Sequence, residues 1–304
     1  MAFDTVIITD GNTHIGPQRM PAQMLADQSY DGHASVHDDE TAAKLGLAGA
    51  PIEGPTHFSQ IDPLGFHVWG RRWFETGCIS SHFRTMVVEG ESVTASLTDS
   101  GDGTATIEAH KADGSPVLAG SASIDPHAPT TLRTRLAEMQ AKDPGALYVI
   151  DRLRVGDRVV VDEPHTIDMD VWNGHMYPFS LRQKLDRITE PSPWYESSDN
   201  PWGRPIVPFE MYSVLTNKTR GMPGVRTPAN GLFIDLEVRA VDGPMFVGQP
   251  YIVEKELLCV GQSRRVESYW TESRVIEADT GRHVATVLLH QGVFKESYPG
   301  YPQS

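Results

Sequence analysis

The chain has 304 residues, of which 39% are hydrophobic and 22% charged, a balance typical of a folded globular protein with one large or two smaller domains. Its 40 acidic and 26 basic side chains give a formal net charge of −14, which argues against nucleic-acid binding because that affinity depends on basic clusters. Cys78 and Cys259 offer neither a disulfide framework nor a metal-binding pair, and no apolar run approaches the roughly 20 residues of a membrane helix. We therefore expect a cytoplasmic protein that does not enter membranes.

The first half of the chain leads from a polar segment into a long helix. A short helix is expected over residues 40–45, followed by a Gly/Pro turn at residues 49–52. Pro55 then opens the longer helix, because a proline in the first turn removes an N–H that has no helical partner.

A hairpin and a linker helix follow. Residues 105–114 and 117–124 alternate apolar and polar side chains around an Asp-Gly turn, which predicts two antiparallel strands. Residues 130–140 form an amphipathic helix that Asp143-Pro-Gly145 ends.

The second half repeats this order of elements. A Gly/Pro turn at residues 203–206 precedes a helix that begins near Pro208, and residues 273–281 and 283–290 form a second hairpin. The distance between equivalent positions grows along the chain, as duplication followed by loop insertion would produce. The sequence thus predicts an α+β protein of two similar domains, at residues 1–145 and 146–304.

Common catalytic motifs are missing from the sequence. It has no G-x-G-x-x-G after a strand and no G-x-x-x-x-G-K-[ST], so neither dinucleotide binding nor a P-loop is expected. It also lacks a G-x-S-x-G elbow. His33 and His37 stand four residues apart, but without H-E-x-x-H or a third ligand nearby we expect no metal site.

Residues 30–52 carry the most specific signal. Two imidazoles and several carboxylates precede the Gly/Pro turn. The spacing of these positions resembles the segment of MaoC-like acyl-CoA hydratases and dehydratases that runs from the catalytic histidine into the central helix. The matching positions are His37, Asp39, Ala43, Gly49, Pro51 and Ile52.

The resemblance implies a double hot-dog fold. Each half would wrap a curved antiparallel sheet around a central helix, with the two sheets side by side. The second half has no histidine in the corresponding loop, so it would shape the acyl pocket while the first half keeps the chemistry. Trp194, Tyr195 and Trp202 would line or plug that pocket, although core packing is the commoner role for such aromatics.

The resemblance also implies a chemistry. An Asp and a His would hold a water that adds to a trans-2-enoyl thioester, or leaves a 3-hydroxyacyl thioester. Backbone N–H groups at the start of the central helix would receive the developing negative charge, here those of Gly54 and Thr56. The substrate would be carried by coenzyme A, with no metal or redox cofactor, and a homodimer is possible.

The aspartate of the family motif G-D-x-N-P-x-H is displaced in this chain. Counting five residues back from His37 gives Gly32, with Asp31 one place further. A one-residue bulge would bring Asp31 into place, and His33 is an alternative, whereas an ordinary turn role for Asp31 stays open.

Glu53 and His57 stand four residues apart at the start of the central helix and could share one face. If both face the pocket, they form an alternative acid–base couple, although a solvent-facing Glu53 is the commoner outcome. This couple favours a second hypothesis, a lyase or isomerase acting on a small molecule that is not a thioester. A third hypothesis is a non-catalytic module for acyl binding or assembly.

Paired arginines suit a phosphate group on an otherwise acidic surface. Arg71 and Arg72 are therefore candidates for holding a coenzyme A phosphate, although exposed arginines are more often only solvated. The partner expected overall is a small acyl thioester or a related molecule.

Overall fold

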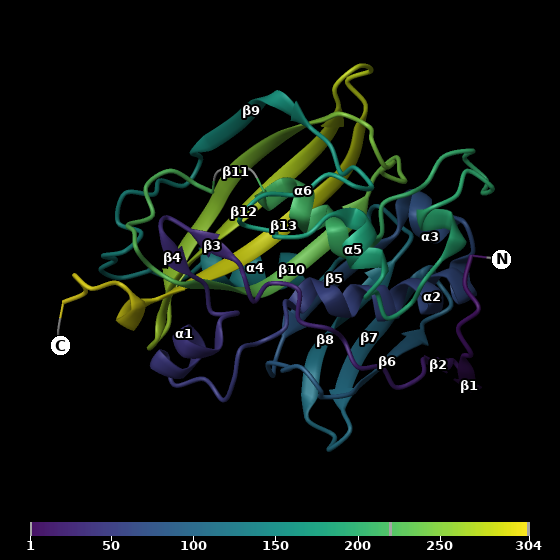
Figure 1. The fold of residues 1–304 in the computed structure, drawn as a ribbon, viewed down its shortest axis with the longest axis horizontal. Coiled ribbons are helices and arrows are strands. Elements are labelled where there is room, and N and C mark those ends of the chain that lie inside the picture. The colour runs from purple at the N-terminus through teal and green to yellow at the C-terminus, as the bar shows by residue number, and fades with distance from the viewer. Residues whose placement is uncertain (1, 219–220, 303–304) are drawn as a thin grey trace.

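The computed structural model describes residues 2–218 and 221–302. Its main feature is an 11-stranded antiparallel sheet (Figure 1). The strands before residue 145 are β1 (Ile8–Asp10), β2 (Thr13–Ile15), β5 (Cys78–Phe83), β6 (Val93–Asp99), β7 (Thr104–Lys111) and β8 (Pro116–Ser123). Those after it are β9 (Arg158–His165), β10 (Gly231–Ala240), β11 (Tyr251–Gln262), β12 (Val266–Glu277) and β13 (His283–Phe294).

The helices lie before β5, between β8 and β9, and between β9 and β10 in sequence. They are α1 (Asp39–Lys44), α2 (Phe58–Trp69), α3 (Arg72–Thr76), α4 (Thr131–Gln140), α5 (Leu181–Leu185) and α6 (Tyr212–Asn217). Short 3₁₀ turns are η1 (Gly54–His57), η2 (Pro193–Tyr195), η3 (Phe209–Met211) and η4 (Lys295–Ser297), and β3 (Ser29–Tyr30) and β4 (His33–Ala34) form a separate small hairpin.

The strand order shows two half-sheets joined edge to edge. It runs β1-β2-β6-β7-β8-β5-β10-β13-β12-β11-β9, so the halves meet at the β5–β10 pair, where Ile79 lies opposite Val238. Both predicted hairpins are present, as β7–β8 and β12–β13. The side-by-side arrangement expected for a double hot-dog protein is therefore confirmed.

The central helices lie in front of the sheet in the view of Figure 1. In the first half, Pro55 occupies the first turn of η1 and α2 continues from it, as predicted. In the second half Pro208 caps η3, and α6 has only six residues, so this central helix is shorter than its counterpart. The starts of the two helices contact each other where the halves meet.

The Asp62 side chain of α2 forms hydrogen bonds to both halves of the protein. Its carboxylate accepts hydrogen bonds from Trp73 Nε1 at 3.0 Å and from the Tyr195 hydroxyl at 3.1 Å. Burial raises the pKa of Asp62 to about 7, against the effect of these donors. Because the carboxylate is fully buried and its partners are supplied, we assign it a structural role.

The linker helix also forms as predicted. The side chain of Thr130 caps α4 by accepting from the Arg133 N–H. The helix packs on β5, β8, β10 and β11, and it therefore bridges the two half-sheets. Within the described part of the chain, no helix is both long and apolar enough to cross a bilayer.

Candidate active site

A cavity of about 620 Å³ lies where the two halves meet. Residues of the small β3–β4 hairpin, of the segment that leads into η1 and of β5, β10, β12 and β13 line it. Its wall is mostly apolar, with side chains that include Leu25, Val36, Ile52, Phe83, Met176, Met222, Ile234 and Val293. Placing a polar side chain against this apolar wall costs free energy unless the side chain is hydrogen-bonded or binds a ligand.

His37 is one of the polar groups on the cavity wall. It precedes α1, whose N-cap is the Asp38 side chain. Its Nδ1 lies 2.5 Å from the carbonyl oxygen of Pro51. Since a carbonyl can only accept, Nδ1 must carry the hydrogen, and the neutral ring then has its lone pair on Nε2.

Nε2 of His37 makes no hydrogen bond to residues 2–218 or 221–302. It is also not among the fully buried polar atoms that lack a partner, so part of its surface is accessible. It is therefore open to the cavity that the residue lines. Burial lowers the pKa of His37 below its ordinary value of 6.5, although the bond to Pro51 and the charge of Glu53 act in the opposite direction. The ring is thus a neutral base at neutral pH.

The start of the central helix also reaches the cavity. The Gly54 N–H precedes the first bond of η1 and has no hydrogen-bond acceptor among the described residues. The Thr56 N–H, in contrast, donates to the carbonyl oxygen of Glu53 at 3.2 Å. Of the two amides expected to hold an oxyanion, only that of Gly54 remains available.

Gly54 is required by its close contact with Phe83. A Cβ at position 54 would lie 2.6–2.8 Å from three atoms of the phenyl ring. We predict that Gly54→Ala lowers the free energy of unfolding by about 1–3 kcal/mol, because the ring or the helix start has to move. Denaturant unfolding of Gly54→Ala, Phe83→Leu and the double variant checks this, and additive losses would contradict it.

Glu53 belongs to a buried charged cluster. Its Oε1 accepts from Lys184 Nζ at 2.9 Å, and the same ammonium donates to Thr56 Oγ1 at 2.9 Å and lies 3.6 Å from Glu210 Oε2. The Glu53 side chain is 7% exposed and that of Lys184 2%. The expectation that Glu53 faces solvent, the commoner outcome for such a residue, is therefore wrong.

Lys184 lies closer to Glu53, at 2.9 Å, than to Glu210, at 3.6 Å. Burial alone would lower the pKa of Lys184, but Glu210 and Glu53 raise it above its ordinary value. Burial raises the pKa of Glu210 to about 8, so Glu210 carries its proton at neutral pH. Glu53 also lines the cavity, where its charge favours the protonated form of His37.

His57 lies beside this cluster and touches the cavity. Burial lowers its pKa to about 4, and its Nδ1 is buried without a hydrogen-bond partner. His57 is therefore a neutral ring packed at the start of α2. Both Glu53 and His57 line the cavity, which is the condition for the alternative acid–base couple considered from the sequence.

Neither Asp31 nor His33 is hydrogen-bonded to His37 in the part of the chain that the structure describes. Asp31 and Gly32 both have positive φ, 51° and 81°, and they connect β3 to β4 as a two-residue hairpin turn. Asp31 is exposed at the rim of the cavity, so the ordinary turn role applies and the proposed bulge is absent. His33 points its Nδ1 to the carbonyl of Ala34, packs edge-on against Tyr30, and is not part of the lining.

The aromatic residues expected in the pocket lie elsewhere. Trp194 and Trp202 pack edge to face at 5.5 Å against each other and join the core around Phe74, and Tyr195 is fully buried against Asp62. They do not belong to the cavity lining, so the prediction that they line it is wrong. Core packing, the commoner role, is what the structure shows.

The predicted phosphate-binding arginines also lie outside the cavity. Arg71 and Arg72 are exposed at the far end of α2, and Arg71 pairs with Glu75 at 2.9 Å. Among residues 2–218 and 221–302, the arginine on the cavity lining is Arg84, which is exposed. Across 2–218 and 221–302, no group of three or more His, Cys, Asp or Glu side chains could hold a metal ion.

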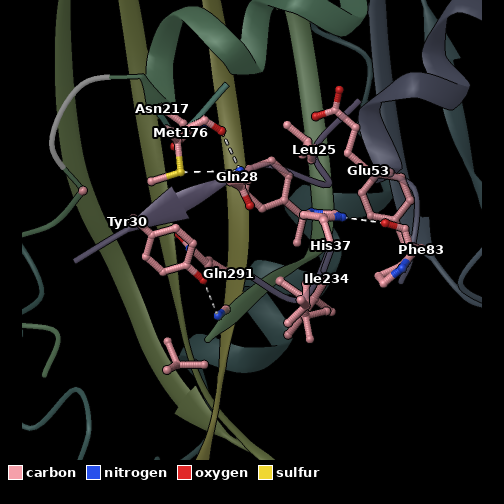
Figure 2. Close-up of a pocket in the computed structure, with 18 of the residues that line it drawn as sticks. Leu25, Gln28, Tyr30, His37, Glu53, Phe83, Met176, Asn217, Ile234 and Gln291 are labelled. Atoms are coloured by element: carbon pink, nitrogen blue, oxygen red, sulfur yellow. Dashed lines mark hydrogen bonds between the residues drawn. The ribbon is translucent and has the colours of Figure 1, made fainter. Parts of the chain in front are cut away.

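Two sets of site residues were not expected from the sequence. Lys184 gave a readable signal, because it stands three residues after Leu181 on the buried side of a helix that the capping box of Ser180 and Gln183 opens. Gln28 and Gln291 gave none, since an isolated amide in a strand or loop has no spacing that marks it. Figure 2 shows both glutamines beside the cavity, together with His37 and Glu53.

No protein-family model and no curated protein matches the sequence. Solved structures do match. A conserved hypothetical protein of Mycobacterium tuberculosis, Rv0216, described as a double hotdog fold, has a TM-score of 0.56 at 14% identity, covering 97% of both chains.

Two further solved structures have the same architecture. A protein of Chloroflexus aurantiacus J-10-fl described as a MaoC domain protein dehydratase has a TM-score of 0.54 at 14% identity, over 97% of this chain and 95% of that one. The dehydratase domain of PpsC from Mycobacterium tuberculosis, solved in complex with C12:1-CoA, has a TM-score of 0.50 at 10% identity, over 95% and 97%. The chain therefore has the double hot-dog fold expected from residues 30–52, and its structural neighbours include MaoC-like dehydratases.

Proposed function

We propose that the chain is a hydro-lyase that adds water to a trans-2-enoyl thioester, or removes water from a 3-hydroxyacyl thioester. The observation that carries this proposal is the His37 ring, whose Nδ1 is held by the Pro51 carbonyl and whose Nε2 is open to an apolar cavity. Dehydratase domains among the structural neighbours support it, one of them solved with an acyl-CoA.

In the hydration direction, His37 Nε2 takes a proton from water while the water oxygen bonds to C3 of the enoyl group. Negative charge then develops on the thioester oxygen, where the Gly54 N–H stabilises it at the positive end of the helix. The imidazolium returns its proton to C2, so that H and OH have been added across the double bond. Dehydration is the reverse sequence, and both need only proton transfers.

Glu53 supports the charged state of His37. During the reaction the ring becomes an imidazolium, and the nearby carboxylate favours that form. Lys184, itself buried, holds the carboxylate in place by donating to its Oε1. In this proposal the carboxylate beside His37 is that of Glu53, whereas the sequence suggested Asp31 as the residue that orients the water.

The experiment is an assay of purified protein with trans-2-enoyl-CoA and 3-hydroxyacyl-CoA esters of increasing chain length. We expect water addition or loss, followed by absorbance of the conjugated thioester and by mass. Absence of turnover across the series, with a bound thioester recovered unchanged, would contradict the proposal and favour a non-catalytic acyl-binding module.

A second candidate, a lyase or isomerase for a small molecule that is not a thioester, is favoured by one observation. Glu53 and His37 line the same cavity while Asp31 does not pair with His37. Turnover of enoyl or hydroxyacyl compounds lacking the thioester, with the CoA esters inert, would support this candidate over the first.

The pH dependence of the reaction follows from the lowered pKa of His37. Only the neutral ring can take the proton, so kcat/KM falls as the pH falls through this pKa, which lies below 6.5. The same sign applies to stability: the unfolded chain binds the proton first, and this contribution to stability is lost as the pH falls below 6.5. We expect a kcat/KM that is constant just above pH 6.5 and falls below it, and an acid limb centred above 6.5 would contradict this.

A further inference from the structure

The cavity has two chemically different sides. Figure 2 shows His37, Glu53 and Phe83 on one side and Gln28, Asn217 and Gln291 with Tyr30 on the other. The reaction proposed above uses only the first side. The second side places three neutral amide side chains against a mostly apolar wall.

Gln291 is held with its amide nitrogen free. It lies opposite Tyr269 in the β12–β13 pair, and the Tyr269 hydroxyl donates to Gln291 Oε1 at 2.8 Å. This bond fixes the orientation of the amide. Within the described ranges, Gln291 Nε2 has no hydrogen-bond acceptor, and it is not fully buried on the lining of the cavity. It lies close to Gly231, where an added Cβ would come within 3.1 Å of it.

Gln28 offers the complementary group. Its Nε2 donates to the Met176 carbonyl at 2.7 Å and lies 3.6 Å from the Met176 sulfur, so both amide hydrogens have partners. Its Oε1 has no donor among the residues described, although the side chain is 8% exposed and lines the cavity. Asn217 differs, because Ser213 and Lys255 already occupy its amide.

From these contacts we propose that the amide side of the cavity binds a neutral oxygen substituent on the acyl group of the substrate. An amide donor and an amide acceptor left open in an apolar cavity are costly unless a ligand uses them. A hydroxyl group can accept from Gln291 Nε2 and donate to Gln28 Oε1, and a keto group can accept from Gln291 alone. The phenol of Tyr30, whose pKa burial raises to about 12, stays neutral. Lys218, next to Asn217 on the lining, already donates to the Thr166 carbonyl and to Asn173 Oδ1.

This inference rests on the proposed function for the identity of the ligand, but its test does not require turnover. Binding of pairs of saturated acyl-CoA esters that differ only in one hydroxyl or keto group along the chain is measured by calorimetry. At the best position we expect the oxygenated member to bind at least about tenfold more tightly, the effect of one or two buried hydrogen bonds. Equal affinity at every position would overturn the inference, even if the enzyme hydrates plain enoyl thioesters.

Variants assign the effect to the amide. Gln291→Leu is expected to abolish the preference while leaving binding of the plain ester intact or improved, and Tyr269→Phe to reduce the preference because the amide loses its anchor. Gln140→Leu, exposed on α4, is the control and should keep the preference. Thermal unfolding checks that each variant folds. Equal weakening of both esters in Gln291→Leu would mean that the amide binds the pantetheine arm, and this would overturn the inference.

Discussion

Replacing His37 with glutamine is expected to lower kcat/KM for the hydration of an enoyl thioester by about 10²–10⁴-fold, the usual contribution of a positioned acid–base group. A glutamine can still donate to the Pro51 carbonyl, so the loop keeps its hydrogen bond. It cannot take a proton from water. Activity should therefore fall while substrate affinity and the melting temperature change little.

The matched control is His33→Gln in the same loop, whose ring is outside the cavity lining. Steady-state kinetics and thermal unfolding of both variants separate a chemical role from a structural one. Comparable activity in His37→Gln and the unmodified protein would show that another group takes the proton, and Glu53→Gln would then be the next variant to assay.

Replacing Lys184 with methionine is expected to have the largest effect on stability. The substitution removes the ammonium that lies 2.9 Å from Glu53 and 3.6 Å from Glu210, and it leaves the Glu53 carboxylate buried without this counter-ion. Breaking one side of a buried ion pair costs about 3–5 kcal/mol, far more than the pair itself contributes. Chemical denaturation should therefore show a free energy of unfolding reduced by about that amount.

A second variant distinguishes an unpaired charge from simple loss of packing. In Lys184→Met with Glu53→Gln the carboxylate is gone and Glu210, with a pKa raised to about 8, is neutral at neutral pH. We expect this double variant to be more stable than Lys184→Met alone. If it is instead less stable, the ion pair does not explain the loss. Lys142→Met, at an exposed position, serves as the control for the substitution type.

The fold could be predicted from the sequence because its signals are local and periodic. Pro55, the Asp-Gly turn of the first hairpin and the linker helix of residues 130–140 each depend on a few neighbouring residues, and each is found where expected. The repeat then gave the order of elements in the second half. Differences between the two halves could not be predicted in this way. No local sequence pattern indicates, for example, that α6 has only six residues.

The site could be predicted only in part, because it depends on contacts between distant segments. The spacing around His37 placed that residue near the central helix, and the structure has it on the cavity wall. The partner of Glu53 comes from 131 residues away in sequence, and the amide of Gln291 is oriented by a neighbouring strand. Neither the spacing of residues along the sequence nor their types reveals such contacts between distant segments.

The errors have a common physical cause. The family resemblance places Trp194 and Trp202 in the acyl pocket, yet these rings pack in the core, where large side chains exclude water from Asp62. The motif predicts a bulge that brings Asp31 to His37, whereas its positive φ places Asp31 in a tight hairpin turn at the cavity rim. In both cases packing or backbone geometry decided the role.

The central claim is that His37 is a neutral imidazole with its Nε2 lone pair open to the cavity. Nitrogen-15 NMR of labelled histidine rings tests it most directly, with the His37 signals assigned by their loss in His37→Gln. At neutral pH we predict an Nδ1-protonated ring whose Nε2 resonance shifts when an acyl-CoA binds. A His37 ring that is protonated on Nε2 or fully charged at neutral pH, and whose signals do not respond to the ligand, would contradict the account.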